Sequence, residues 1–312
     1  MRILLLVTSP RLPAGLLTAE AWDAVRAQPV LAAAESPLTD AVRAAGGAVT
    51  IVPPRVDALL EHARESDVIW LAGPTGDPDL ARELGVRLAR QPGLAELEVT
   101  YGSWDPAGAR LLDAVAVMDR LYSPGGDPWK RAQTHQSLAQ FMLEEAYEAY
   151  DAIEAEDLAG LREELGDVLL QVVLHARLAE DLPEDQRWSV DDVAAGLVDK
   201  MIRRNPHVFA GTEVGSIDEI IKNWEQIKKA EKSRDSAMDG VALSQPALAL
   251  AAKFLQRAER AHLDVALPEG DDLGSRLLRL VAAARAAGED PEAALRAAAL
   301  RYAEAVRAAE RS

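Results

Sequence analysis

Apolar and polar residues follow two different patterns along the chain. In residues 1 to about 104, short apolar runs typical of strands alternate with stretches of helical period. The predicted strands are Ile3–Thr8, Thr50–Pro53, Val68–Ala72 and Leu97–Tyr101, and the predicted helices are Leu17–Ala27, Asp57–Glu65 and Pro78–Arg90. Because the apolar runs are nearly continuous, we expect strands buried on both faces of a parallel sheet. Residues 1–104 are therefore predicted to form a small α/β domain.

From Ala109 onward the apolar residues follow a helical period. Helices are predicted at Ala109–Leu121, from Ser189 to Asn205 and at Ser216–Lys232. Two more helices are predicted within Leu143–Asp167, one on each side of a polar break, and the second of them continues through Val168–Leu178. Pro124, Gly125-Gly126 and Pro128 mark a loop. The chain is predicted to be mainly α, with residues 105–240 and 241–312 as two helical parts.

The last part contains an echo of the middle one. Leu165–Arg177 (LGDVLLQVVLHAR) aligns without gaps to Leu273–Arg285 (LGSRLLRLVAAAR). Ser275 stands in place of Asp167, and Asp272 in place of Glu164. The preceding segment is too short for a second acidic helix, so we interpret residues 241–312 as an eroded copy with a structural role.

Two sets of acids within Leu143–Asp167 carry the candidate chemistry. They are Glu144, Glu145 and Glu148, followed by Glu163, Glu164 and Asp167. Spacings of three and four residues place each set on one helical face. Both faces adjoin apolar residues, where like charges would repel unless a cation neutralised them. Carboxylate oxygens in this pattern favour Mg²⁺, or Mn²⁺, and Mg²⁺ usually brings substrate phosphates with it.

Composition narrows the classes of function. The net charge of −17 argues against non-specific binding to nucleic acid or anionic membrane. The absence of cysteine excludes disulfides and Cys-ligated zinc. The first apolar run is too short for a signal peptide, and no run reaches the length of a membrane span. We therefore expect a soluble, cytoplasmic protein.

Cationic residues follow on two later helices. Lys200 and Arg204 lie four residues apart, as do Trp224 and Lys228. Such faces have the charge needed for triphosphate oxygens that a metal leaves uncovered, and two solvated faces are the alternative. His135 is interpreted as a polar or packing residue, because no second His or Cys lies near it in the sequence.

Together these segments resemble the MazG nucleoside triphosphate pyrophosphohydrolases. The resemblance covers residues 109–235 closely and 245–310 weakly, and rests on GGDPWKRAQTHQSL, FMLEEAYEAYDAI, LREELGDVLLQVVLHARLAE, DDVAAGLVDKMIRRNPHVFAG and NWEQIKKAEK. It implies an all-α NTP-pyrophosphatase fold for residues 105–240, a helical bundle completed by dimerisation or by a tandem copy. The implied partners are nucleoside triphosphates and a second copy of the chain, as a homodimer or higher oligomer.

The resemblance also implies a reaction and a set of site residues. The reaction is NTP and water to NMP and pyrophosphate, with Mg²⁺, over a broad range of nucleotides that includes non-canonical ones. The implied metal ligands are Glu145, Glu148, Glu164 and Asp167, with Glu144 as the candidate base, and the implied substrate contacts are Lys200, Arg204, Trp224 and Lys228. Lys130 departs from the family, which usually has an acid after the loop tryptophan.

Two alternatives to this function remain open at this stage. An enzyme of the same fold could act on one nucleotide, as a dUTPase-like or phosphoribosyl-ATP type pyrophosphohydrolase. A non-catalytic oligomeric protein could hold structural Mg²⁺ with the same acids.

Residues 1–104 resemble, faintly, the first half of a tetrapyrrole methylase domain, but Ser9-Pro10-Arg11 stands where its glycine-rich signature is expected. We therefore interpret that domain as degenerate, with a docking or stabilising role.

Overall fold

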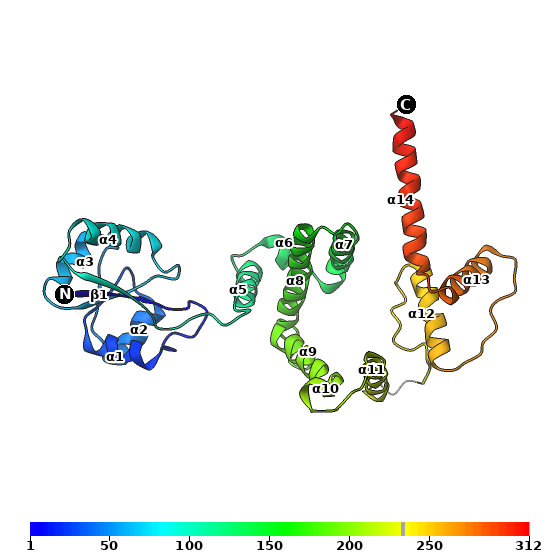
Figure 1. The fold of residues 1–312 in the computed structure, drawn as a ribbon, viewed down its shortest axis with the longest axis horizontal. Coiled ribbons are helices and arrows are strands. Elements are labelled where there is room, and N and C mark those ends of the chain that lie inside the picture. The colour runs from blue at the N-terminus through cyan, green and yellow to red at the C-terminus, as the bar shows by residue number, and fades with distance from the viewer. Residues whose placement is uncertain (232–234, 312) are drawn as a thin grey trace. The chain divides into compact units, whose positions relative to one another are not determined.

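The computed structural model describes residues 1–231 and 235–311 (Figure 1). The chain divides into two compact units, Met1–Gly196 and Leu197–Ser312, and their boundary falls within the helix α9, Val190–Arg204. Division into parts at residues 104 and 240 stays a prediction. Two predicted ends, Lys232 and Ser312, lie outside the described residues.

A five-stranded parallel sheet opens the first unit. Its strands are β1 Arg2–Val7, β2 Val30–Ala32, β3 Val49–Ile51, β4 Val68–Leu71 and β5 Glu96–Tyr101, in the spatial order β3-β2-β4-β1-β5. The connecting helices are α1 Ala19–Ala27, α2 Pro37–Ala44, α3 Val56–Ala63 and α4 Pro78–Arg90. Parallel neighbours require such crossovers, and right-handed crossovers place helices on opposite faces when the chain reverses direction.

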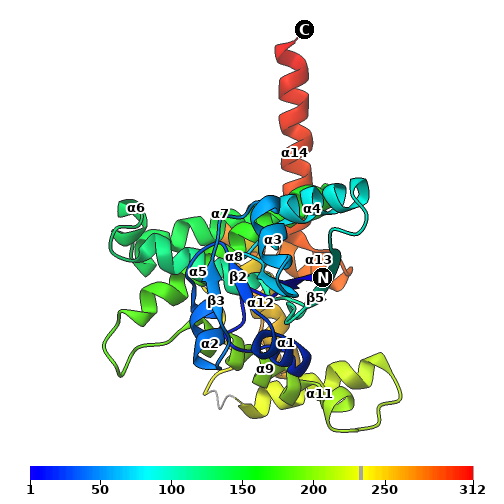
Figure 2. The same cartoon turned by 90° about the vertical axis from the view of Figure 1, so that its left-hand side faces the viewer.

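Two apolar cores follow from the alternation of side chains along β1. Ile3 and Leu5 pack with residues of α3 and α4, whereas Leu4 and Leu6 pack with residues of α1 and α2. The ribbon shows α1 and α2 on one face of the sheet and α3 and α4 on the other (Figure 1, Figure 2). The predicted α/β fold of this region, with strands buried on both faces, is confirmed in its central strands.

One strand and one helix of the sheet region were absent from the prediction. β2 has only three residues, all buried, so it shows no alternation. The alanines that follow it favour a helix locally, and pairing of β2 between β3 and β4 overrides that preference. α2 is short and begins at a capping box formed by Ser36 and Thr39.

The rest of the first unit is helical, as predicted, except that the helical turn Pro128–Arg131 lies within the segment predicted to be a loop. It contains α5 Arg110–Tyr122, the single turn α6 Pro128–Arg131, α7 His135–Glu154 and α8 Leu158–Glu180. Met118 of α5, Leu138 of α7 and Leu174 of α8 are all buried in one core. Three helices thus share a single apolar centre, with α8 against both others.

The second unit contains helices alone within the residues that are described. They are the end of α9, then α10 Pro206–Phe209, α11 Ile217–Glu231, α12 Ala247–Arg260, α13 Leu273–Ala286 and α14 Pro291–Glu310. α12 packs against α13 and α14. Across the described ranges of both units, every helix is too short or too polar to cross a bilayer. The mainly α fold class with a small sheet region is confirmed.

Candidate functional site

The acids are brought together by a tight helical hairpin. α7 begins at a capping box in which Thr134 accepts from the backbone N–H of Ser137 at 3.1 Å. After α7, Glu156 adopts a left-handed conformation with φ of 53°. Asp157 then caps α8 by accepting from the N–H groups of Ala159 and Gly160. Because only three residues join the helices, α7 and α8 lie side by side and their acids face one another.

Three carboxylates converge at the centre of this hairpin. Glu145 of α7 and Glu164 and Asp167 of α8 each offer an oxygen, and these oxygens lie within 4.8 Å of one another. All three side chains are half-buried. Glu148 is exposed at the edge of the cluster, where its charge acts on Glu164, while Glu144 is exposed one residue before Glu145. The hairpin therefore gathers acids that the sequence places about 20 residues apart.

The electrostatics of the cluster favour a cation. Burial raises the pKa of Glu145, and the negative charges of Asp167, Glu148, Glu144 and Glu164 raise it further. Burial likewise raises the pKa of Glu164, with added repulsion from Glu148 and Asp167. Among the ion pairs of the described residues, none joins the three clustered acids to Lys or Arg. Oxygen ligands, negative charge and no internal cation fit a hard divalent ion such as Mg²⁺.

Three of the four predicted substrate contacts lie together in the second unit, with Arg204 and Lys228 over the ring of Trp224. The guanidinium carbon of Arg204 lies 5.3 Å from the Trp224 ring centroid, and Lys228 Nζ lies 4.8 Å from it. Lys200 is half-buried, one turn before Arg204 on α9. α11 presents Trp224 and Lys228 on one face because they are four residues apart. A cationic aromatic platform results.

Arg204 is already engaged with a carboxylate. Its Nη2 donates to Glu231 at 2.6 Å, and Arg203 Nε donates to the same side chain at 2.7 Å. These two guanidinium groups lower the pKa of Glu231 to about 2. The Arg204 side chain is only 10% exposed. Glu231 thus fixes the guanidinium over Trp224, a contact that sequence reasoning missed because the partners lie 27 residues apart.

A histidine pair was also missed. Nδ1 of His135, at the start of α7, and Nδ1 of His175 in α8 share a hydrogen bond of 2.7 Å. Their rings are nearly parallel with centroids 5.0 Å apart, and the ring of Trp188 is nearly parallel to that of His135 with centroids 6.2 Å apart. The partner of His135 is thus 40 residues away in the sequence. The sequence indicates this pair only in that His175 and Gln171 are polar residues on an otherwise apolar face of α8.

Lys130, the departure from the family pattern, has local partners. Its Nζ lies 3.4 Å from Asp127 and 5.5 Å from the Trp129 ring centroid. Asp127 also caps α6 by accepting from the N–H of Trp129 at 2.9 Å. Lys130 therefore stabilises its own loop.

Comparisons with known proteins bear on the same segments. The family model described as "MazG nucleotide pyrophosphohydrolase domain" matches residues 133–209, which include α7, α8 and α9. A protein of Streptomyces cacaoi, described as "Uncharacterized 26.1 kDa protein in blaB 3'region", is 48% identical over 77% of this chain and 99% of its own length.

Two further relatives have a stated activity. A "Nucleoside triphosphate pyrophosphohydrolase" of Mycolicibacterium smegmatis is 46% identical over 65% of this chain, which spans only 60% of that relative. The "Nucleoside triphosphate pyrophosphohydrolase/pyrophosphatase MazG" of Thermotoga maritima is 35% identical over 64% of this chain and 84% of its own length. With the acidic hairpin in the matched region and most of that relative covered, this chain belongs to the MazG family of nucleotide pyrophosphohydrolases.

Proposed function

We propose that this chain hydrolyses nucleoside triphosphates to the monophosphate and pyrophosphate, with Mg²⁺ as the metal. The observation that carries the proposal is the cluster of Glu145, Glu164 and Asp167, whose oxygens lie within 4.8 Å of one another. Carboxylates that repel one another and lack a basic partner favour a divalent ion, and Mg²⁺ commonly binds together with phosphates. Membership of the family supports the same reaction.

The acids of the hairpin divide into ligands and a base in this proposal. Glu145, Glu148, Glu164 and Asp167 would hold the metal. When bound, Mg²⁺ supplies charge neutralisation at phosphate oxygens and lowers the pKa of water. Glu144 is exposed beside the cluster, so its carboxylate is placed to accept a proton from the attacking water. Because Glu144 is outside the three-carboxylate cluster, it retains an unshared carboxylate for this role.

The platform of α9 and α11 would receive the nucleotide. Trp224 offers a ring face on which any base can stack, which supports broad specificity that includes non-canonical nucleotides. Lys200 and Lys228 would offset charge on the triphosphate and on the leaving pyrophosphate. Arg204 would add charge there too, although Glu231 already neutralises part of it. A homodimer, as the resemblance implies, is part of the proposal.

Product analysis tests this function. The full chain is incubated with Mg²⁺ and a panel of canonical and non-canonical triphosphates, and the products are separated by ion exchange. We expect NMP and pyrophosphate from several bases. Glu145→Gln should abolish both products, whereas Glu154→Gln, the same change at an exposed position later on α7, should leave the rate unchanged.

Each proposed alternative gives a different result. Turnover of one nucleotide alone would point to a single-substrate enzyme of the same fold. NDP and phosphate as products, or NMP formation that survives Glu145→Gln, would remove the catalytic role of the cluster. Metal binding without any turnover would leave the protein as a non-catalytic binder.

A further inference from the structure

A cavity of about 650 Å³ lies at the carboxyl edge of the parallel sheet. Its wall comes from residues 8–10 and 12–17 after β1, from residues 32–39 at the end of β2 and beyond it, and from residues 71–74 and Asp77 at the end of β4 and beyond it, with Ser103 after β5. α2 leads from β2 outward to β3, whereas α4 leads from β4 to β5 at the opposite edge. β2 and β4 therefore flank a switch point, where open α/β sheets bind ligands. The volume suits a small molecule.

The chemistry of the wall argues against an anionic ligand. Leu12, Leu16 and Leu38 supply apolar surface, and Glu35 and Asp77 supply carboxylates. The residues that line the cavity, all within the described range, include no Lys, Arg or His. The two carboxylates also stand at the starts of α2 and α4, where a phosphate would otherwise bind. A phosphate placed there would meet the charge of Asp77 and that of Glu35, which Arg43 offsets only from outside the wall, and no cation of the wall itself would compensate it.

Glu35 offers a specific contact for hydroxyl groups. It is the first acid after β2, its side chain is 61% exposed, and it accepts from Arg43 Nη2 at 2.9 Å. In dinucleotide-binding sheets, an acid in this region accepts from ribose hydroxyls, and a glycine-rich loop after the first strand holds the phosphates. Here the loop after β1 begins Thr8-Ser9-Pro10 and lacks those glycines. The sheet thus has an acid after β2 but no glycine-rich loop for phosphates after β1.

We propose that this cavity binds an uncharged nucleoside, with its ribose hydroxyls on Glu35 and its base against the apolar wall. The proposal is independent of the pyrophosphohydrolase reaction, which uses acids on α7 and α8. It concerns ligand binding only and includes no chemical step.

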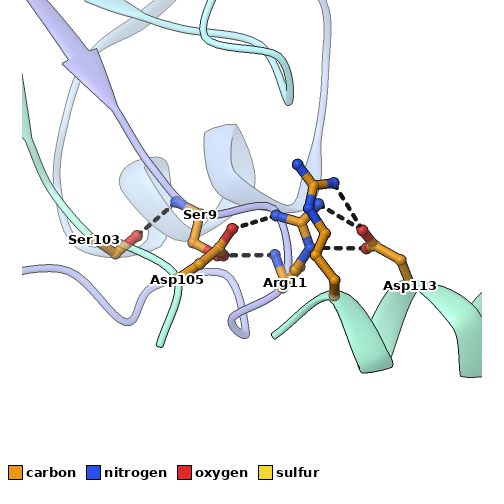
Figure 3. A network of polar contacts seen from close by, with 6 residues as sticks. Ser9, Arg11, Ser103, Asp105 and Asp113 are labelled. Carbon is orange, nitrogen blue, oxygen red and sulfur yellow. Dashed lines mark hydrogen bonds and ion pairs between the residues drawn. The ribbon is translucent and has the colours of Figure 1, made fainter. Parts of the chain in front are cut away.

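A polar network holds the cavity wall in position (Figure 3). The backbone N–H of Ser9 donates to Ser103 Oγ at 2.9 Å, and Ser9 Oγ donates to Asp105. Arg11 pairs with Asp105 and, through Nε at 2.9 Å, with Asp113 of α5. Since Ser9 and Ser103 both line the cavity, the network fixes two of its strand ends before any ligand arrives. Such preorganisation lowers the entropic cost of binding.

Calorimetric titration of the full chain tests the site. Adenosine, guanosine, cytidine and uridine are each titrated without divalent metal, each beside its own monophosphate and triphosphate. We expect at least one nucleoside to bind with a Kd below about 1 mM, and its phosphorylated forms to bind at least about tenfold more weakly. Glu35→Gln should weaken that nucleoside by about tenfold, because it removes the charged acceptor.

A variant that fills the cavity distinguishes binding at this site from binding at the nucleotide platform. Ala33 is exposed and lines the cavity, so Ala33→Phe should abolish nucleoside binding, while Ala27→Phe at the exposed far end of α1 should not. Trp224→Ala should also leave it intact. Failure of all four nucleosides to bind, binding that survives Ala33→Phe in a protein with unchanged circular dichroism, or binding lost in Trp224→Ala would each overturn the proposal.

Discussion

α8 and α13 have the same apolar pattern but different surroundings for their acids. Val173 and its counterpart Val281 are both buried, at 4% and 2% exposure. Arg177 pairs with Asp119 of α5 at 2.7 Å, and its counterpart Arg285 pairs with Glu259 of α12 at 2.9 Å. The echo in the sequence therefore corresponds to a buried valine in each helix and to an arginine that pairs with an acid of a neighbouring helix.

The difference lies in where each helix begins. α8 begins at Leu158, so Glu164 lies inside the helix and faces the acids of α7. α13 begins at Leu273, so its counterpart Asp272 is the N-cap and accepts from the Ser275 N–H at 3.0 Å. The carboxylate of Glu164 therefore repels the neighbouring acids, whereas that of Asp272 accepts a hydrogen bond from a backbone N–H of its own helix. A shared apolar pattern therefore does not imply a shared site.

The largest expected effect comes from giving α8 the residue that α13 has. Asp167→Ser should lower the rate of NMP formation by on the order of a thousandfold, because it removes one of the three clustered carboxylates. Initial rates of pyrophosphate release at saturating Mg²⁺ measure the loss. The helical circular dichroism should be unchanged, since Asp167 is half-buried and outside the apolar core.

The reverse exchange is the matched control. Ser275→Asp should neither add activity nor add a second Mg²⁺-binding event in calorimetry, because α13 has no facing acidic helix before it. A rate close to that of the wild type for Asp167→Ser would contradict the assignment of Asp167 as a ligand. Metal binding gained by Ser275→Asp would contradict the interpretation of residues 241–312 as structural.

A smaller effect is expected for the two arginines, which should contribute differently to the stability of the protein. Arg177 is 16% exposed, pairs with Asp119 and Asp181, and lies 4.9 Å from the Tyr122 ring centroid. Arg177→Ala should therefore lower the free energy of unfolding by about 2 kcal/mol. Arg285→Ala, which breaks one pair with the exposed Glu259, should cost about 0.5 kcal/mol. Urea unfolding of both variants measures the difference, and equal losses would show that the two contacts are equivalent.

Much of this fold follows from periodicity along the sequence. The long helices and the central strands repeat apolar residues often enough to define their period, and their ends are marked by residues such as Ser189 and Pro206. β2 could not be predicted, because three buried residues carry no period and their neighbours favour a helix. Its position depends on pairing with β3 and β4, which is a tertiary contact.

The candidate site was predictable to the extent that its residues are regularly spaced. Glu145 and Glu148, like Glu164 and Asp167, lie three residues apart, so the sequence indicates their common faces. The pairs Arg204–Glu231 and His135–His175 could not be predicted, because 27 and 40 residues separate the partners. Their contact depends on how the helices pack, and no local pattern specifies that.

His175 provides a pH-dependent difference between the helices, since α13 has Ala283 at the corresponding position. Burial, and then the neighbouring His135, lower the pKa of His175. An unfolded histidine has a pKa of about 6.5, so below that pH the unfolded chain takes up a proton that the folded protein does not. The contribution of His175 to the free energy of unfolding is therefore fully present above about pH 6.5. It is lost as the pH falls from there toward the lower pKa of His175 in the folded protein.

His175→Ala isolates this contribution. Urea unfolding from pH 7.5 to pH 5 should show that the variant loses the uptake of about one proton on unfolding. His262→Ala, an exposed histidine in the second unit, should leave the pH dependence unchanged. An unaltered slope in His175→Ala would show that this histidine protonates equally in both states.

The smallest effect has opposite signs in the two helices. Without divalent metal, Glu164→Ala should raise Tm by about 2 °C, because it removes repulsion from Glu148 and Asp167 and introduces a strong helix former. Asp272→Ala should lower Tm by about 3 °C, because it removes the N-cap of α13. Scanning calorimetry in EDTA measures both shifts, and adding Mg²⁺ should stabilise the wild type but not Glu164→Ala. A lower Tm for Glu164→Ala in EDTA would show that the acid already has a stabilising partner within the protein, and the cluster would then have no need of a metal.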